Sequence, residues 1–443
     1  MAGEFPGTVQ STADLSQDGH PRQFRPGLFL LEFLPALLAA LAIAPWVIQF
    51  GRADPWGPAT IDLDVYTLAV QALVNGQDLY AVRSPGYQLP FIYPPIAAYL
   101  MLPFGLLPKV AMQLIWTVLG VLALRLVLVR CGVRRGVTVA VLGVVAVLAV
   151  EPIRTTLGYG QVNTVLMALV VADLLPGTPQ TGHRDRLPRG TLLGLAAAIK
   201  LTPLLFIVFC LILGRRGREQ LRVGLTAITS FGVLGLLGLV LQPSGTLTFV
   251  EKVLTGDTYG NPVYVGNQSL GAVFARTWPQ PTANPTSGGS DQGLGGLVAG
   301  AVIALVALYV ARQLWLRADK VLAVGVVGMA TCLASPLSWT HHHVWLIPFF
   351  IGLVGSGLPR ILKIGGSAWA LWNAVCPVLA FLPYGNNIEL TYTAAQRLVA
   401  NLGPLLGSAV LLGAALWLVR RRPERSTATT DRTPHPSTEP SSA

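Results

Sequence analysis

The sequence predicts an all-α, polytopic membrane protein. Of its 443 residues, 52% are hydrophobic and 12% are charged, whereas soluble domains carry about 25% charged residues. Several apolar runs, including 28–50, 223–242 and 398–419, are long enough to cross the hydrocarbon core, which takes about 20 residues of helix. These observations favour one domain embedded among membrane lipids over several soluble ones.

The two ends of the chain differ in composition from its apolar middle. Residues 1–27 are polar and residues 423–443 are rich in Pro, Ser and Thr. We therefore expect a cytoplasmic tail at each end of a membrane domain at 28–422, the second tail being disordered. The net charge is +11, but the basic residues are scattered between apolar runs, which argues against nucleic-acid binding. Nothing in the sequence specifies an oligomeric state.

The positions of Lys and Arg between the apolar runs predict the topology, because positive charge resists translocation. We expect about ten spans, with both ends in the cytoplasm and two outer segments at 51–90 and 243–295. The short run at 96–107 is expected on the outer interface, or re-entering it. The run 191–213 has basic residues beyond both ends and is interrupted by Lys200 and Pro203. We expect a hairpin of two short helices there, with its tip at 200–203.

Polar residues gather in the segments expected on the outer side. Asp62 and Asp64 open a predicted helix that runs to 75–76, and Asp62 suits either an N-cap or a general base. Arg154 precedes a Gly-rich turn at 158–163, and an arginine beside an apolar run is costly unless it is paired or hydrated. Lys200 at membrane depth indicates a functional site, with snorkelling or pairing to a carbonyl as the alternative.

Two further outer groups carry polar side chains. A loop at 266–270 is followed by Arg276 within a long segment, and long loops in compact folds are usually functional. Three consecutive histidines begin at His341, shortly after Trp339. On a helix their side chains point in three directions, and no further ligand stands at zinc spacing. Anion binding or proton handling is therefore favoured over a metal site.

An aspartate that shares one side of the membrane with Arg, Lys and His residues indicates a ligand that bears phosphate. The carboxylate suits deprotonation of an acceptor hydroxyl, and the cations suit stabilisation of a phosphate leaving group. On the periodicity of the apolar runs alone, a transporter is the alternative to an enzyme. Two long outer segments break the two-halves symmetry usual in transporters, and the sequence has no clear internal repeat.

Motifs at 62–66, 75–80, 91–95, 160–163, 198–203, 267–270 and 335–342 resemble, in order, those of glycosyltransferase family 87. Its members are actinobacterial enzymes of GT-C fold that use polyprenyl-phosphate sugars. The resemblance implies inverting transfer of mannose from polyprenyl-phosphate-mannose to a lipid-anchored glycan of the phosphatidylinositol mannoside or lipomannan type. It further implies an α-1,2 linkage and an extracytoplasmic active site on the inner (plasma) membrane. Arabinofuranosyl transfer from polyprenyl-phosphate-arabinose is the alternative within the family.

The resemblance also implies roles for individual residues. Asp62 matches the base in the first outer loop, and Asp64, two residues along the helix, should face elsewhere. The candidates for binding the donor phosphate are Arg154, Lys200, His341 and His342. The candidates for the substrate pocket are Asp64, Tyr66, Tyr93, Gln161, Asn163, Asn267, Gln268, Arg276 and Trp339. No cofactor and no metal ion are expected, and the absence of a nucleotide-sugar DxD motif from the cytoplasmic loops agrees with a lipid donor.

Overall fold

The computed structural model describes residues 25–44, 60–175, 177, 187–215, 217–255, 260–278 and 293–421. The expected cytoplasmic tails therefore lie almost wholly outside the described residues, as do parts of both expected outer segments. Among the described residues, β structure is limited to two isolated antiparallel bridges, Arg83 with Pro90 and Asn267 with Trp339. The all-α prediction is confirmed for this part of the chain.

The helices follow one another along the chain with short connections. They are α1 (Pro26–Ile43), α2 (Ile61–Val74), α3 (Pro95–Gly105), α4 (Lys109–Arg130), α5 (Val137–Ala149), α6 (Glu151–Tyr159), α7 (Asn163–Leu174), α8 (Thr191–Ile199), α9 (Leu204–Gly214), α10 (Arg218–Leu241), α11 (Pro243–Thr255), α12 (Leu270–Thr277), α13 (Gly293–Leu316), α14 (Lys320–Ala334), the 3-10 helix η2 (Thr340–Trp345), α15 (Leu346–Gly355), α16 (Arg360–Val375), α17 (Pro377–Phe381), the 3-10 helix η3 (Ile388–Thr391) and α18 (Ala394–Arg420).

Five of the described helices are long and apolar enough to cross a membrane, namely α1, α4, α10, α13 and α18. A sixth candidate is the pair α5 and α6, which is bent by 74° at Val150. The bend arises where Pro152 begins a new helix, so residues 151–154 form the first turn of α6. The second outer segment, expected as a loop, contains the helices α11 and α12.

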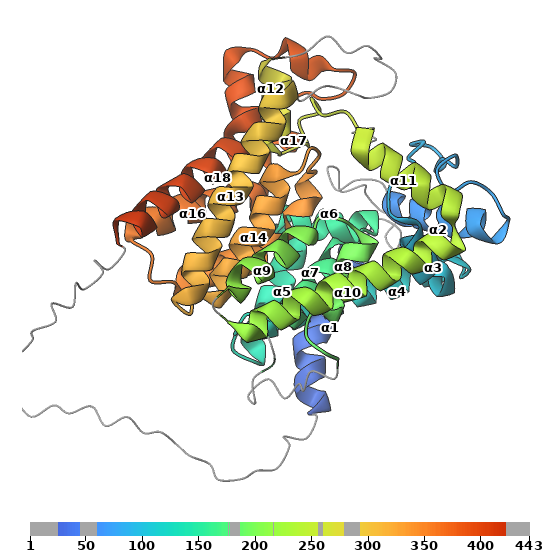
Figure 1. Cartoon of the computed structure of the whole chain (residues 1–443), viewed down its shortest axis with the longest axis horizontal. Helices are drawn as coiled ribbons and strands as arrows, with labels where there is room; N and C mark the ends of the chain where they lie inside the picture. Colours follow the sequence, from blue (N-terminus) through green and yellow to red (C-terminus); the bar gives the residue numbers. More distant parts are fainter. Residues whose placement is uncertain are drawn as a thin grey trace, which may run out of the picture.

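The run 191–213 forms two short helices, α8 and α9, separated by a break at 200–203. The start of α8 and the end of α9 both lie against the first turns of α10. Gly190 packs on the backbone of Val223, and Gly214 packs on Leu221. The start of α8 and the end of α9, called the hairpin feet below, thus lie at the same end of α10, which crosses the front of the molecule in Figure 1. The two helices therefore form a hairpin, and the prediction is confirmed.

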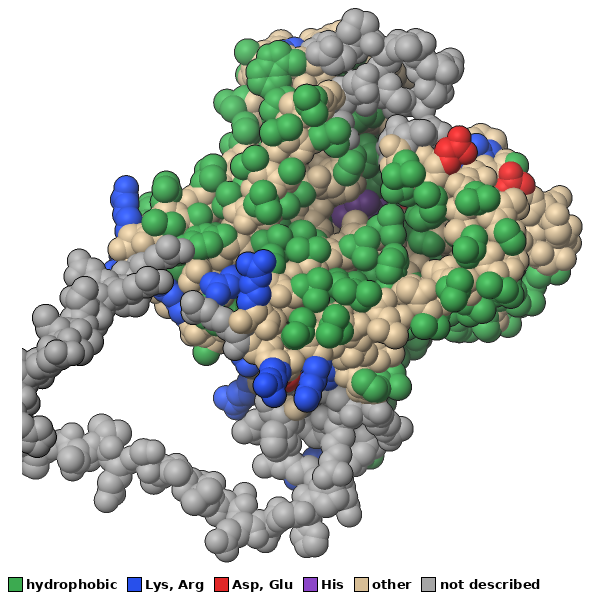
Figure 2. All heavy atoms as spheres, viewed as in Figure 1, with side chains coloured by type: hydrophobic (Ala, Val, Ile, Leu, Met, Phe, Trp, Pro, Cys, Tyr) green, Lys and Arg blue, Asp and Glu red, His purple; other side chains and the backbone are tan. Residues whose placement is uncertain are grey.

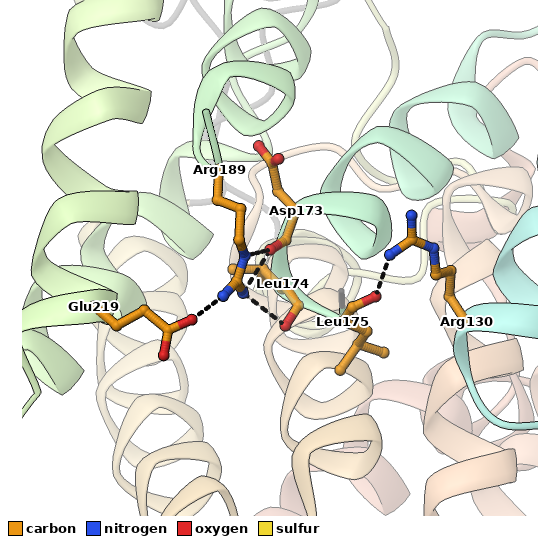
Figure 3. Close-up of polar contacts among 6 residues, drawn as sticks. All are labelled: Arg130, Asp173, Leu174, Leu175, Arg189 and Glu219. Atoms are coloured by element: carbon orange, nitrogen blue, oxygen red, sulfur yellow. Dashed lines mark hydrogen bonds and ion pairs between the residues drawn. The ribbon is translucent and has the colours of Figure 1, made fainter. Parts of the chain in front are cut away.

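Polar contacts fix the feet of this hairpin (Figure 3). The Arg189 guanidinium donates to the carbonyls of Asp173 and Leu174 at the end of α7, at 2.8 to 3.4 Å, and pairs with the Glu219 carboxylate in α10. The Asp173 carboxylate accepts the backbone N–H of Leu193 at 2.7 Å, which satisfies a free donor at the start of α8. The hairpin is therefore tied to both α7 and α10 at its base.

Replacement of Arg189 by Met is expected to lower the thermal stability of the protein. The change leaves two carbonyls at the end of α7 without their charged donor, and each hydrogen bond to a charged group contributes about 1.5–3 kcal/mol. Thermal denaturation of the detergent-solubilised protein measures the effect. The control is Arg222→Met on the exposed side of α10. Equal midpoints for the two variants would contradict a clamping role for Arg189.

A second ionic cluster joins α1, α4 and α5 at one end of the bundle. Glu32 in α1 is buried and accepts from Arg125 and Arg135, both at 2.5 Å, and from the backbone N–H of Gly136 at 2.8 Å. Two cations and a backbone donor compensate the cost of burying this carboxylate. Figure 2 shows most of the visible Lys and Arg side chains along its lower and left-hand edges, whereas two acidic patches lie at the upper right.

Candidate active site

A cavity of 1890 Å³ lies among the segments that join the helices on the side opposite the hairpin feet. Its walls come from the start of α2, the loop before α3, the hairpin tip, α11, α12, the start of α13 and the loop leading into η2. Figure 2 shows histidine side chains at the bottom of a hollow near the centre of the molecule, and the described histidines are those of η2. Residues far apart in the sequence thus share one concave surface, as binding sites require.

Asp62 lies in the first turn of α2 and lines this cavity. The start of α2 is fixed by Thr60, whose backbone N–H donates to the Gly158 carbonyl at 2.8 Å and whose hydroxyl accepts from Gln113 at 2.7 Å. Thr60, in a left-handed conformation, is the N-cap residue, so the N-cap interpretation of Asp62 is wrong. Its carboxylate is therefore available to a ligand.

Burial raises the pKa of Asp62 to about 7, although the charge of Lys200 and a hydrogen bond from Gln161 both lower it. A carboxyl group with this pKa is ionised in a large fraction of molecules near neutral pH and still binds a proton well. These are the properties of a general base.

Lys200 lies at the tip of the hairpin and also lines the cavity. Its ammonium donates to Asn163 Oδ1 at 3.1 Å and lies 3.3 Å from His342 Nε2. A lysine ammonium only donates, so this His342 nitrogen is the acceptor. The ammonium also lies 5.8 Å from the centre of the Tyr93 ring. These contacts aim a cation into the same cavity that Asp62 faces.

His341 lines the cavity and has an unsatisfied ring nitrogen. Its Nε2 atom is buried and has no hydrogen-bond partner among the residues that the structure describes. The ring packs edge-on against Tyr159 at 5.3 Å, and the His341 carbonyl accepts from Thr156 and Asn163 at 2.9 and 3.0 Å. Asn163 therefore holds both the backbone of η2 and the Lys200 ammonium. His343 is buried, and its Nδ1 atom lies 3.4 Å from the Trp339 carbonyl.

Comparison with known proteins identifies the chain. The model of glycosyltransferase family 87 matches residues 91–336 of the 443. The chain belongs to glycosyltransferase family 87. A Mycobacterium tuberculosis protein named polyprenol-phosphate-mannose-dependent alpha-(1-2)-phosphatidylinositol mannoside mannosyltransferase is 33% identical over 359 residues, which cover 75% of this chain and 78% of the relative.

A second relative, from Mycolicibacterium smegmatis, is named as the corresponding phosphatidylinositol pentamannoside mannosyltransferase. It is 32% identical over 353 residues, 77% of this chain and 80% of the relative. No solved structure matches the chain. This family 87 protein is a glycosyltransferase and a multi-pass membrane protein, which agrees with its apolar helices.

Several of the predicted site residues meet around the cavity of this family 87 enzyme. Asp62, Tyr93, Gln161, Lys200, Trp339, His341 and His342 line it. Tyr66 and Asn163 lie directly behind it, through hydrogen bonds to Gln161 and Lys200 respectively. Among the described residues, no three His, Cys, Asp or Glu side chains form a group that could hold a metal ion. The four cysteines are all free and buried.

Two predicted residues have contacts elsewhere. The Asp64 carboxylate pairs with Lys109 at 2.9 Å, and more than half of the Lys109 side chain is exposed. The Arg154 guanidinium donates to the Leu148 carbonyl at 2.9 Å across the bend between α5 and α6. Neither is among the residues that line the cavity. Their geometry supports local structural roles rather than contact with a substrate or its phosphate.

Three other predicted pocket residues build the wall instead of facing the ligand. Asn267 accepts the backbone N–H of Ser338 at 2.9 Å, which fixes the loop that carries Trp339. Gln268 donates to the carbonyls of Val265 and Ala400. Arg276 is fully buried and donates to Asn401, and to the Tyr264 and Asn267 carbonyls. These side chains tie the second outer segment to α18 and to the entry of η2.

Several residues that line the cavity were not predicted from the sequence. Phe249 and Lys252 come from α11, Tyr159 from α6, Tyr264 from the second outer segment and Asn386 from the segment before η3. A signal was present for α11, because apolar residues recur at helical spacing between Leu247 and Leu254. The contribution of Asn386 depends on tertiary contacts that no local pattern specifies.

Proposed function

We propose that this family 87 enzyme transfers mannose from polyprenyl-phosphate-mannose to a phosphatidylinositol mannoside, forming an α-1,2 linkage. The observation that carries the proposal is that Asp62 and Lys200 face one cavity and interact electrostatically within it. Asp62 suits the role of general base, and Lys200 suits binding of the donor phosphate. The names of the curated relatives support the choice of donor and acceptor.

The chemistry requires one bond to form as another breaks. The acceptor oxygen attacks the anomeric carbon of the β-linked mannose, and the bond from that carbon to the phosphate oxygen breaks with inversion. The acceptor proton passes to the Asp62 carboxylate, and polyprenyl phosphate leaves with the bonding electron pair. The Lys200 ammonium, with His341 and His342 beside it, stabilises the charge that develops on the phosphate.

The same proposal assigns the cavity to the extracytoplasmic face of the plasma membrane. Arg189 precedes the start of α8 and Arg215 follows the end of α9, and the charge rule favours the cytoplasm for such an end. Lys200 lies at the opposite end of the same helices, together with the cavity. About ten spans accommodate this arrangement if the shorter apolar helices also cross.

A donor comparison with purified protein in lipid vesicles tests the proposal. We expect a mannosylated phosphatidylinositol mannoside from polyprenyl-phosphate-mannose and little product from polyprenyl-phosphate-arabinose. Linkage analysis of the product should give α-1,2-mannose. Preferential use of the arabinose donor would overturn the assignment. Movement of the labelled donor across the vesicle membrane without a glycosidic product would identify a transporter instead.

A further inference from the structure

The side chain of Gln161 lines the same cavity as Asp62 and makes several hydrogen bonds. Gln161 follows Gly160, which closes α6 in a left-handed conformation. Its backbone N–H donates to the Thr156 carbonyl at 2.9 Å, and its carbonyl accepts from the Trp116 indole at 3.4 Å. The side chain is buried, with 5% of the residue exposed. Its position is therefore fixed before any substrate arrives.

The direction of the Gln161 amide is determined by a backbone donor. The Val162 N–H lies 3.2 Å from Oε1 of Gln161. A backbone N–H only donates, so this atom of the amide is the oxygen. The amide nitrogen is consequently the atom that faces the Tyr93 hydroxyl.

Two tyrosines close the amide into a ring of hydrogen bonds. The amide nitrogen donates to the Tyr93 hydroxyl at 3.1 Å, which lies 3.1 Å from the Tyr66 hydroxyl. The Tyr66 hydroxyl donates back to Oε1 of Gln161 at 3.0 Å. Each hydroxyl donates one hydrogen bond and accepts one in this ring. Hydrogen bonds connected in this way polarise and strengthen one another. One amide hydrogen remains for a further acceptor. Asp62 lines the same cavity as Gln161, and Gly160, which precedes Gln161, packs on the side chain of Leu63 next to Asp62. A hydrogen bond from Gln161 lowers the pKa of Asp62.

We propose that Gln161 is a positioning residue that holds the Asp62 carboxylate in its ionised form and orientation, with Tyr66 and Tyr93 locking the direction of its amide. This inference rests on the proposed role of Asp62 as the base. A hydrogen bond donated to a carboxylate stabilises the charged form, because the protonated acid accepts it less well. Gln161 thereby keeps a buried carboxyl group ionised in a useful range of pH.

Other groups also act on Asp62 and have to be held constant in a test. Lys200 approaches it from the hairpin tip and lowers its pKa. Tyrosines from three elements surround it, and two histidines of η2 line the same cavity. The titratable and charged groups on the elements around Asp62 include Asp64, Tyr66, Tyr93, Lys109, Glu151, Arg154, Tyr159, Lys200, His341, His342 and His343.

The test is the dependence of kcat/KM on pH for Gln161 variants. In the wild type, kcat/KM should rise with pH through about 7, because the base acts when ionised. Gln161→Met removes the donor, so the midpoint should move upward by about 1 pH unit. Gln161→Glu keeps the shape of the side chain and sets a second carboxyl oxygen against Asp62, so the midpoint should move at least as far upward.

Gln71→Met is the matched control. It makes the same chemical change at an exposed position on α2, outside the residues that line the cavity. Its midpoint should equal that of the wild type. Wild-type midpoints in both Gln161 variants, alongside an inactive Asp62→Asn, would overturn the role of Gln161 and leave the proposed function intact. Near-normal turnover of Asp62→Asn would instead remove the base assignment itself.

Discussion

Replacement of Asp62 by Asn is expected to lower turnover by about 10²–10⁴-fold, the usual contribution of a general base. Asparagine has nearly the same shape but cannot take the acceptor proton. The loss should appear in kcat, whereas the KM for the lipid donor should change little, because the phosphate ligands are intact. Initial rates of mannose transfer in vesicles measure both quantities.

Asp64→Asn is the control for this experiment. It makes the same chemical change two residues along the same helix, where the carboxylate pairs with Lys109 outside the cavity. Surface ion pairs contribute about 0–1 kcal/mol, so stability and turnover should stay close to those of the wild type. Equal losses in the two variants would indicate damage to α2 rather than the removal of a base.

Replacement of Lys200 by Met is the second change with a large expected effect. The ammonium lies where the leaving phosphate gains charge, and removal of one such stabilising group lowers kcat by about 10²–10³-fold. The KM for polyprenyl-phosphate-mannose should also rise, because the phosphate is charged before the reaction. The measurement is a donor titration at a saturating concentration of acceptor.

Lys109→Met serves as the matched control for the lysine. Its ammonium lies outside the cavity and contacts only Asp64 among the hydrogen bonds of the described side chains. The Lys109→Met variant should leave the KM for the donor unchanged. A Lys200→Met enzyme with the donor KM and kcat of the wild type would contradict phosphate binding by Lys200.

The hairpin and the residues at its tip could be predicted from the sequence because charge and length act locally. Basic residues at both ends of 191–213, with Lys200 between them, favour a hairpin over a single span. The roles of Arg276 and Asn267 could not be predicted in this way. An arginine on an outer segment suits an anion, but here its guanidinium meets backbone carbonyls because α12 packs on α18. Such packing depends on distant parts of the chain.

The break at Lys200 has a consequence for how the protein enters the membrane. With 9 and 11 residues, α8 and α9 are each shorter than the roughly 20 residues that a spanning helix needs. Neither half is therefore a stable insertion intermediate, and the hairpin has to enter as a pair that carries an amine at its tip. The long helix α10, which contacts both halves, follows directly in the chain. The hairpin therefore has its main packing partner only once the chain has been synthesised through Leu241.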